Sequence, residues 1–153
     1  MLLSELLNAR AVAARLKAGT KRDAMIELVG LLETGHGLES RGEILDRVLR
    51  REAMMSTGIG NGVAIPHGKA RSVDRMLAAC AVSREGVDFD SIDGQPTYIF
   101  FVVVAPENST GIHLKALARI SRLFKDPEFR QRLLAAPDAH EMYRTIADED
   151  AKY

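Results

Sequence analysis

Two long apolar runs in the middle of the chain constrain its fold more than any other feature of the sequence. They are Met76–Val82 and Thr97–Val104, and each is apolar, rich in β-forming residues and as long as a typical strand. Neither shows the alternation of a half-exposed strand, so we expect both to be buried on both faces of a sheet. The turn-forming segment 92–96 leads into the second strand.

Helix signals precede these strands. Arg10–Leu16 is a plausible first strand. A helix then opens at Thr20, because Asp23 lies three residues on, as in an approximate capping box, and apolar residues follow at helical spacing. Gly35 or Gly37 ends this helix.

A second helix is predicted to start at Ser40, with Glu43 at the capping-box position. The last third of the chain is helical in pattern: an apolar stripe over 114–124, a helix capped by Asp126-Pro127 and a short helix over 142–146. Helices, then strands, then helices predict an α/β fold, a three-layer α/β/α sandwich with a mixed central sheet. The strand order stays open.

Length and charge narrow the class of protein. The 153 residues fit a single domain, 1–153, and the 21 basic and 21 acidic residues leave a formal net charge of zero. We therefore expect no general attraction to nucleic acid or to an anionic membrane. The longest apolar run, Ile99–Ala105, is too short to span a bilayer, and the single cysteine, Cys80, permits no internal disulfide. We expect a cytoplasmic protein without direct membrane insertion.

A glycine-rich segment follows the second helix. Gly58, Gly60 and Gly62 alternate and let successive N–H groups point into one concavity, a nest that suits an anion. Thr57 either supplies a hydroxyl to that anion or braces the turn. The segment has neither the spacing of a nucleotide-binding loop nor that of a dinucleotide-binding motif. We therefore take Thr57, Gly58, Gly60 and Gly62 as phosphate-nest candidates.

His67 is the leading chemical candidate. It follows the short buried run 63–65 and Pro66, which has no N–H and is expected to end strand pairing there, and Gly68 leaves room beside it. A histidine has an ordinary pKa of about 6.5, so a neutral ring nitrogen is available to attack at cellular pH. A nucleophilic ring beside amide donors is what phosphoryl transfer needs. The alternative is that His67 merely sits in a turn.

Two further residues could act with His67. His113 stands at the start of an amphipathic helix, whose positive end suits a phosphoryl oxygen and disfavours protonation of the ring. Its alternative is an exposed histidine beside a helix cap. Arg51 can contact phosphate with two N–H groups, or it can pair with Glu52 or lie in solvent. Lys69 is expected to be solvated.

The other histidines, the cysteine and several arginine and apolar residues are expected to have structural roles. We expect His36 and His140 at the surface and Cys80 as a small buried residue. A solvated helix face is expected for Arg119, Arg122 and Arg130. Met54, Met55 and Ile59 flank the glycine segment, where they pack in the core by default or form a docking rim.

The chain resembles the enzyme IIA domains of the fructose–mannitol type of the sugar phosphotransferase system, a family that includes nitrogen-regulatory enzyme IIA proteins. The resemblance covers about residues 3–146. It rests on Arg51-Glu52, on the segments 56–62, 64–67 and 89–96, and on His113-Leu114.

The resemblance implies specific roles. His67 matches the histidine that accepts a phosphoryl group from the phosphohistidine of the carrier HPr and passes it to a cysteine of a IIB partner. His113 matches the second active-site histidine, and Arg51 matches a basic residue near the phosphoryl group. The family implies neither a metal nor an organic cofactor.

Three classes of function remain open at this stage. A phosphocarrier of sugar transport is the leading hypothesis. A regulatory enzyme IIA would instead use its phosphorylation state to choose protein partners. A metal-dependent or hydrolytic enzyme is disfavoured because no zinc-binding histidine motif and no nucleophile-elbow motif occurs in the sequence. The sugar, the cognate IIB and the oligomeric state are not specified.

Overall fold

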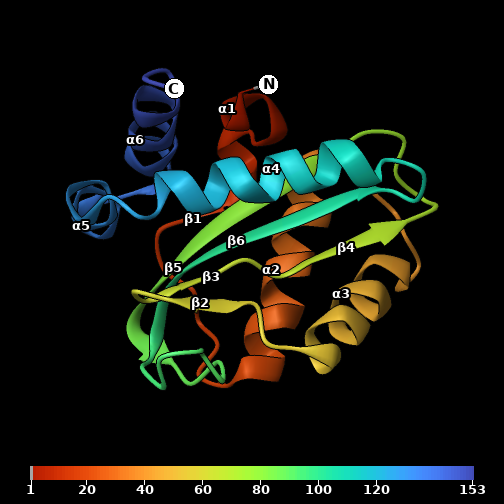
Figure 1. The fold of residues 1–153 in the computed structure, drawn as a ribbon, viewed down its shortest axis with the longest axis horizontal. Coiled ribbons are helices and arrows are strands. Elements are labelled where there is room, and N and C mark those ends of the chain that lie inside the picture. The colour runs from red at the N-terminus through yellow and green to blue at the C-terminus, as the bar shows by residue number, and fades with distance from the viewer. Residues whose placement is uncertain (1) are drawn as a thin grey trace.

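The computed structural model describes residues 2–153 and contains one six-stranded sheet. Along the sheet the order is β1-β5-β6-β3-β2, with β4 also paired to β6. Strands β5 and β6 are antiparallel, as are β2 and β3, whereas β1 runs parallel to β5 and both β3 and β4 run parallel to β6 (Figure 1). This confirms the predicted mixed sheet. The strands are β1 (Val12–Ala13), β2 (Gly58–Gly60), β3 (Val63–Ala64), β4 (His67–Ala70), β5 (Leu77–Val87) and β6 (Thr97–Pro106).

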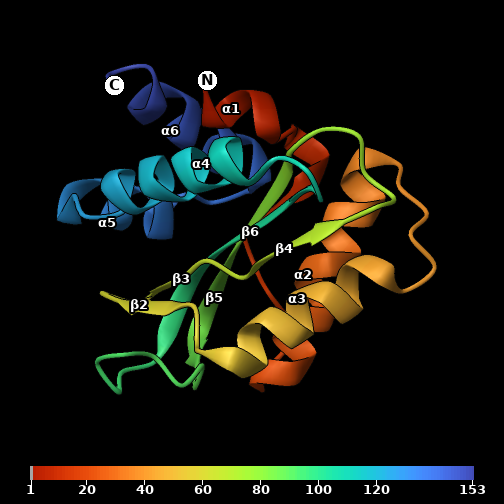
Figure 2. The same ribbon diagram turned by 45° about the vertical axis from the view of Figure 1, so that its right-hand side comes forward.

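Helices cover both faces of this sheet. Helices α2 and α3 pack on one face, and α1, α4, α5 and α6 gather on the other (Figure 2). The predicted three-layer α/β/α sandwich is therefore confirmed. The helices are α1 (Leu3–Leu6), the 3-10 helix η1 (Ala9–Ala11), α2 (Lys21–His36), α3 (Glu43–Met54), α4 (Thr110–Leu123), α5 (Pro127–Ala135) and α6 (Ala139–Asp150).

Strand β6 shows why the sequence contains an unbroken apolar run. Successive side chains of a strand point to opposite faces. Accordingly Phe101 and Val103 enter the core under α4, α5 and α6, while Phe100 and Val102 enter the core under α2 and α3. All four side chains are fully buried. The prediction that this strand is covered on both faces is confirmed.

Of the two helix starts predicted ahead of the strands, one is confirmed and the other is wrong. The Thr20 hydroxyl accepts the Asp23 N–H at 3.3 Å and caps α2, which ends at Gly37 in the left-handed conformation. Helix α3, in contrast, begins at Glu43 after Gly42 rather than at Ser40. The Glu43 carboxylate does not reach back to form a capping box, because it accepts the backbone N–H groups of Arg71 and Ser72, each at 2.9 Å.

Several surface predictions also change. His36 is half-buried, with its Nε2 2.8 Å from the Ala78 carbonyl oxygen, so its assignment to the surface is wrong. Arg119 is not simply solvated, because it pairs at 2.8 Å with the fully buried Asp150 of α6. Arg130 donates to the Phe124 carbonyl oxygen at 2.6 Å. Three other predictions are confirmed: Arg122 and His140 are exposed and Cys80 is buried.

No helix within residues 2–153 combines the length and the apolar character needed to cross a membrane.

Candidate functional site

His67 is the first residue of strand β4 and does not sit in a turn. Strand β3 ends at Ala64, before Pro66, and pairing to β6 resumes when His67 pairs with Val103, so the predicted end of pairing is only a short interruption. The Pro66 carbonyl oxygen still accepts the Val103 N–H at 3.0 Å, because proline loses only the donor. Gly68 brings β4 close to α3, where an added Cβ atom would lie 3.2 Å from the carbonyl carbon of Arg47.

The His67 ring is held in one protonation pattern. Its Nδ1 lies 2.8 Å from the Ile65 carbonyl oxygen. A carbonyl oxygen only accepts, so Nδ1 carries the hydrogen and the neutral ring presents the Nε2 lone pair. Burial of the half-buried ring, and then the positive charge of Arg51, lower the pKa of His67 below its ordinary 6.5. At neutral pH, Nε2 is therefore unprotonated and keeps its lone pair.

His113 lies directly against His67, with the ring centroids 5.3 Å apart and the planes at 52°. It occupies the first turns of α4 and is only 5% exposed, so the alternative of an exposed histidine is wrong. Burial, and then the charges of His67 and Lys69, lower the pKa of His113 to about 4. Its Nδ1 is buried and has no hydrogen-bond partner among the residues that the structure describes. His113 is thus neutral at pH 7 and keeps unused hydrogen-bonding capacity.

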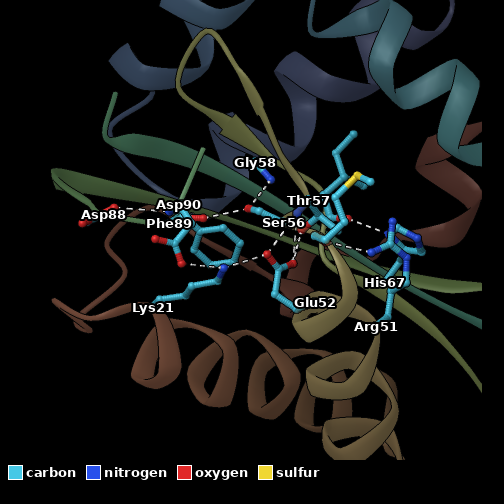
Figure 3. Close-up of polar contacts among 12 residues, drawn as sticks. Lys21, Arg51, Glu52, Ser56, Thr57, Gly58, His67, Asp88, Phe89 and Asp90 are labelled. Atoms are coloured by element: carbon cyan, nitrogen blue, oxygen red, sulfur yellow. Dashed lines mark hydrogen bonds and ion pairs between the residues drawn. The ribbon is translucent and has the colours of Figure 1, made fainter. Parts of the chain in front are cut away.

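Arg51 projects from the last turn of α3 toward His67 (Figure 3). Its Nη1 donates to the Met55 carbonyl oxygen at 2.8 Å, which fixes the guanidinium at the end of the helix. Within residues 2–153 it forms no ion pair, and the suggested pairing with Glu52 does not occur. The remaining guanidinium N–H groups are available to a ligand.

A cleft between α3, β4 and α4 contains both histidines. Arg51 and Lys69 contribute cations that no carboxylate of the described chain neutralises, and no acidic side chain lines this cleft. Lys69 is tethered rather than freely solvated, since its Nζ donates to the Thr110 hydroxyl at 2.7 Å. Positive charge and unpaired donors around a neutral nucleophile suit a phosphoryl group. The lining residues are Arg47, Arg50, Arg51, Met54, His67, Gly68, Lys69, His113, Leu114 and Leu117.

The structure divides the nest candidates into two pairs. Thr57 and Gly58 line a second cavity that shares Arg51 and His67 with the first. Gly60 and Gly62 instead flank the turn between β2 and β3, with positive φ values of 90° and 74°, and line neither cavity. The Asn61 N–H between them donates to the Asp93 carboxylate at 3.2 Å.

Glu52 is a site residue whose role sequence reasoning missed. Its carboxylate accepts the Thr57 N–H at 3.0 Å and the Thr57 hydroxyl, and it pairs with Lys21 at 2.9 Å (Figure 3). The available signal was its spacing, because Ile44, Val48 and Glu52 follow one another every four residues on the buried face of α3.

Apolar side chains surround the two cavities. Met54, Met55 and Ile59 are 81%, 71% and 42% exposed, so the default expectation of core packing is wrong for all three. Ile92 and Leu114, at the edges of the same cavities, are also strongly exposed. We call the five residues the apolar rim; such an exposed patch beside a chemical site is typical of a protein-docking surface.

No group of three or more histidine, cysteine, aspartate or glutamate side chains in residues 2–153 is arranged to hold a metal ion.

Fold and site together define an α/β domain with a neutral histidine in a positively charged cleft. Residues 5–149 match the family described as phosphoenolpyruvate-dependent sugar phosphotransferase system, EIIA 2, and the chain belongs to this family.

Known relatives carry two kinds of name. The chain is 36% identical to the nitrogen regulatory protein of Bradyrhizobium diazoefficiens over 96% of its own length and 95% of that protein. It is 35% identical to the fructose-specific EIIABC component of Bacillus subtilis over 98% of its length, but it spans only 24% of that longer relative. The crystal structure of nitrogen regulatory protein IIA-Ntr from Neisseria meningitidis superposes with a TM-score of 0.87 and 32% identity, over 94% of this chain and 98% of that one.

Proposed function

We propose that this domain is a phosphohistidine carrier, in which His67 accepts a phosphoryl group from phospho-HPr and passes it to a IIB domain. The observation that carries the proposal is the bond from His67 Nδ1 to the Ile65 carbonyl oxygen, which leaves Nε2 unprotonated in a cleft lined by uncompensated cations. The lowered pKa of His67 keeps it in that state at neutral pH.

The transfer step follows from this geometry. The Nε2 lone pair of His67 attacks phosphorus, a P–N bond forms, and the P–N bond of the donor histidine breaks as its ring nitrogen takes back the bonding electron pair. Arg51 and a ring N–H of His113 stabilise charge on the phosphoryl oxygens. The second transfer, to a cysteine of IIB, repeats the exchange with the thiolate as nucleophile.

Partner assignment rests on charge, on the apolar rim and on the relatives. The B. subtilis relative is named as an EIIABC component, and this chain matches a quarter-length portion of it, which supports a IIB unit as acceptor. The exposed side chains of Met54, Met55 and Leu114 give HPr and IIB an apolar surface beside His67. A reducing, cytoplasmic setting fits the buried free thiol of Cys80.

The test is intact mass after incubation with phosphoenolpyruvate, enzyme I and HPr. We expect one acid-labile phosphoryl group on the wild type and none on His67→Ala under exhaustive conditions. His113→Ala should still acquire the group, but more slowly, because it removes stabilisation and leaves the nucleophile. Full labelling of His67→Ala at the normal rate would show that His67 is not the carrier.

A regulatory role is the second candidate, and one observation favours it. Two relatives that this chain matches over 95% and 91% of their length are named nitrogen regulatory proteins. In that role the phosphorylation state of His67 would change which protein binds at the apolar rim. Affinity capture with the unphosphorylated domain and with its phosphorylated form separates the two roles. Capture of HPr and IIB alone, in either state, would contradict regulation.

A further inference from the structure

The carboxylate of Glu52 is buried although no catalytic step uses it. Its side chain is only 4% exposed, and such a charge is stable only when it is paired and hydrogen-bonded. Lys21 of α2 supplies the countercharge at 2.9 Å and is itself held by Asp90 at 3.1 Å and stacked over the Phe89 ring at 4.8 Å. Three segments far apart in the sequence therefore meet around the Glu52–Lys21 pair.

Both hydrogen-bond donors of Thr57 point at that carboxylate (Figure 3). The Thr57 N–H lies 3.0 Å from Oε2, and the Thr57 hydroxyl donates to Oε1. A hydroxyl has one hydrogen, so it cannot at the same time donate to a phosphoryl oxygen. Of the two roles considered for Thr57, the contacts support bracing.

From Thr57 a chain of hydrogen bonds continues to the reactive ring. The Thr57 carbonyl oxygen accepts the Ile65 N–H at 3.0 Å. The Ile65 carbonyl oxygen in turn accepts Nδ1–H of His67 at 2.8 Å. The ring has no other hydrogen bond within the described chain, so the position of Ile65 sets its tautomer and its orientation.

We propose that Glu52 is a positioning residue for phosphoryl transfer, acting on His67 through Thr57 and Ile65. The expected effect on the transfer rate rests on the proposed carrier function. The expected effect on the tautomer of His67 does not depend on it. Glu52 fixes Thr57, Thr57 fixes Ile65, and Ile65 holds the hydrogen on Nδ1 so that Nε2 faces the cleft. Lys21 makes the buried charge of Glu52 tolerable.

Glu52 could instead act through its charge alone, since a carboxylate near His67 favours the protonated ring. Two variants separate these routes. Thr57→Val removes one bond of the chain and leaves the charge of Glu52 and its pairing with Lys21 intact. Thr57→Ser restores the hydroxyl and should restore wild-type behaviour.

The decisive readout is the tautomer of His67 in the unphosphorylated protein, from two-bond nitrogen–proton correlations of a 15N-histidine-labelled sample. We expect the Nδ1–H tautomer to dominate in the wild type and in Thr57→Ser. In Glu52→Ala and Thr57→Val we expect a mixture of the two neutral tautomers. Glu43→Gln is the matched control, because Glu43 also lies on α3 and accepts two backbone N–H groups, those of Arg71 and Ser72, but has no link to Ile65.

Single-turnover transfer from phospho-HPr supplies the kinetic readout. Misplacing a nucleophile by about 1 Å costs up to about 100-fold in rate, so we expect a loss of about tenfold for Thr57→Val and more for Glu52→Ala. Glu43→Gln should transfer at the wild-type rate.

The inference is overturned if folded Thr57→Val and Glu52→Ala keep the wild-type tautomer. An Nε2–H tautomer in the wild type would overturn it as well. Failure of the carrier function is distinguishable, because the wild type would then take up no phosphoryl group while the tautomer measurement still reports on Glu52. Should Glu52→Ala fail to fold, the comparison of Thr57→Val with Thr57→Ser decides the matter.

Discussion

The protonation of two adjacent histidine rings controls what the cleft can do. If both were charged, they would repel each other and Arg51, and neither would offer a lone pair to phosphorus. Burial and the neighbouring cations lower both pKa values, and that of His113 falls to about 4. The same positive surroundings that would hold a phosphoryl group in the proposed function thus keep both rings neutral.

This shift predicts the pH dependence of stability. A histidine whose folded pKa is about 4 and whose ordinary value is 6.5 binds its proton more tightly when unfolded. Its contribution to the free energy of unfolding is therefore complete above pH 6.5 and is lost as the pH falls toward 4. We expect His113→Gln to flatten this part of the profile, measured by urea denaturation at successive pH values.

The control for this experiment is His140→Gln, because His140 is exposed and has no such environment. It should keep the wild-type slope. Equal slopes in the wild type and in His113→Gln would contradict the buried, neutral assignment of His113.

Helix α2 approaches the N-terminal segment so closely that one position tolerates no side chain. A Cβ atom added at Gly35 would lie 2.7 Å from both the Cα and Cβ atoms of Ala11 in η1, a distance at which something must shift. Asn8 fastens the same contact by donating to the Gly35 carbonyl oxygen at 2.8 Å. The packing of α2 on η1 therefore depends on this glycine.

Two glycines of α2 give a matched pair of substitutions. Gly35→Ala forces α2 away from η1 and should lower the free energy of unfolding by about 1–3 kcal/mol. Gly30→Ala adds a Cβ atom where no heavy atom lies within 4 Å, and it should raise that free energy by about 0.5–1 kcal/mol through helix propensity. Thermal and urea unfolding of both variants measure the difference. Effects of the same sign would show that the close approach does not limit stability.

The helices at the two ends of the described chain pack against each other. Helix α1 packs on α6, where the Ser4 N–H donates to the Asp150 carboxylate at 3.2 Å and the Tyr143 hydroxyl donates to the Ser4 carbonyl oxygen at 3.2 Å. Arg119 of α4 completes the junction by pairing with the fully buried Asp150. One carboxylate therefore ties together three helices of the same layer (Figures 1 and 2).

Removing that carboxylate should weaken the whole fold and leave the chemistry intact. We expect Asp150→Ala to lower the free energy of unfolding by about 3 kcal/mol, because it leaves Arg119 partly buried without its partner. Its folded fraction should still take up one phosphoryl group, since neither residue lines the cleft. Arg122→Ala, on the exposed side of α4, should change stability by less than about 0.5 kcal/mol. A similar loss in both variants would contradict the assigned role of Asp150.

The sequence by itself determined the features that depend on neighbours along the chain. The apolar runs of β5 and β6, the Thr20 cap and the Pro127 helix start were predicted correctly, because strand burial, capping and proline geometry are local. His67 was also singled out from its segment, and its role as phosphoryl acceptor stays a prediction.

Only the tertiary structure decided how these residues meet. The pairing of His67 with Val103 and the packing of α4 bring the ring centroids of His67 and His113 to 5.3 Å from each other. No local sequence pattern encodes that distance. The Glu43 carboxylate accepts the backbone N–H groups of residues 71 and 72 instead of forming the predicted cap. Glu52 forms an ion pair with Lys21 of α2. Such side chains can form hydrogen bonds to near or to distant residues, and which bonds form depends on how the layers pack. The contacts that hold His67 in place could therefore not be predicted from the sequence.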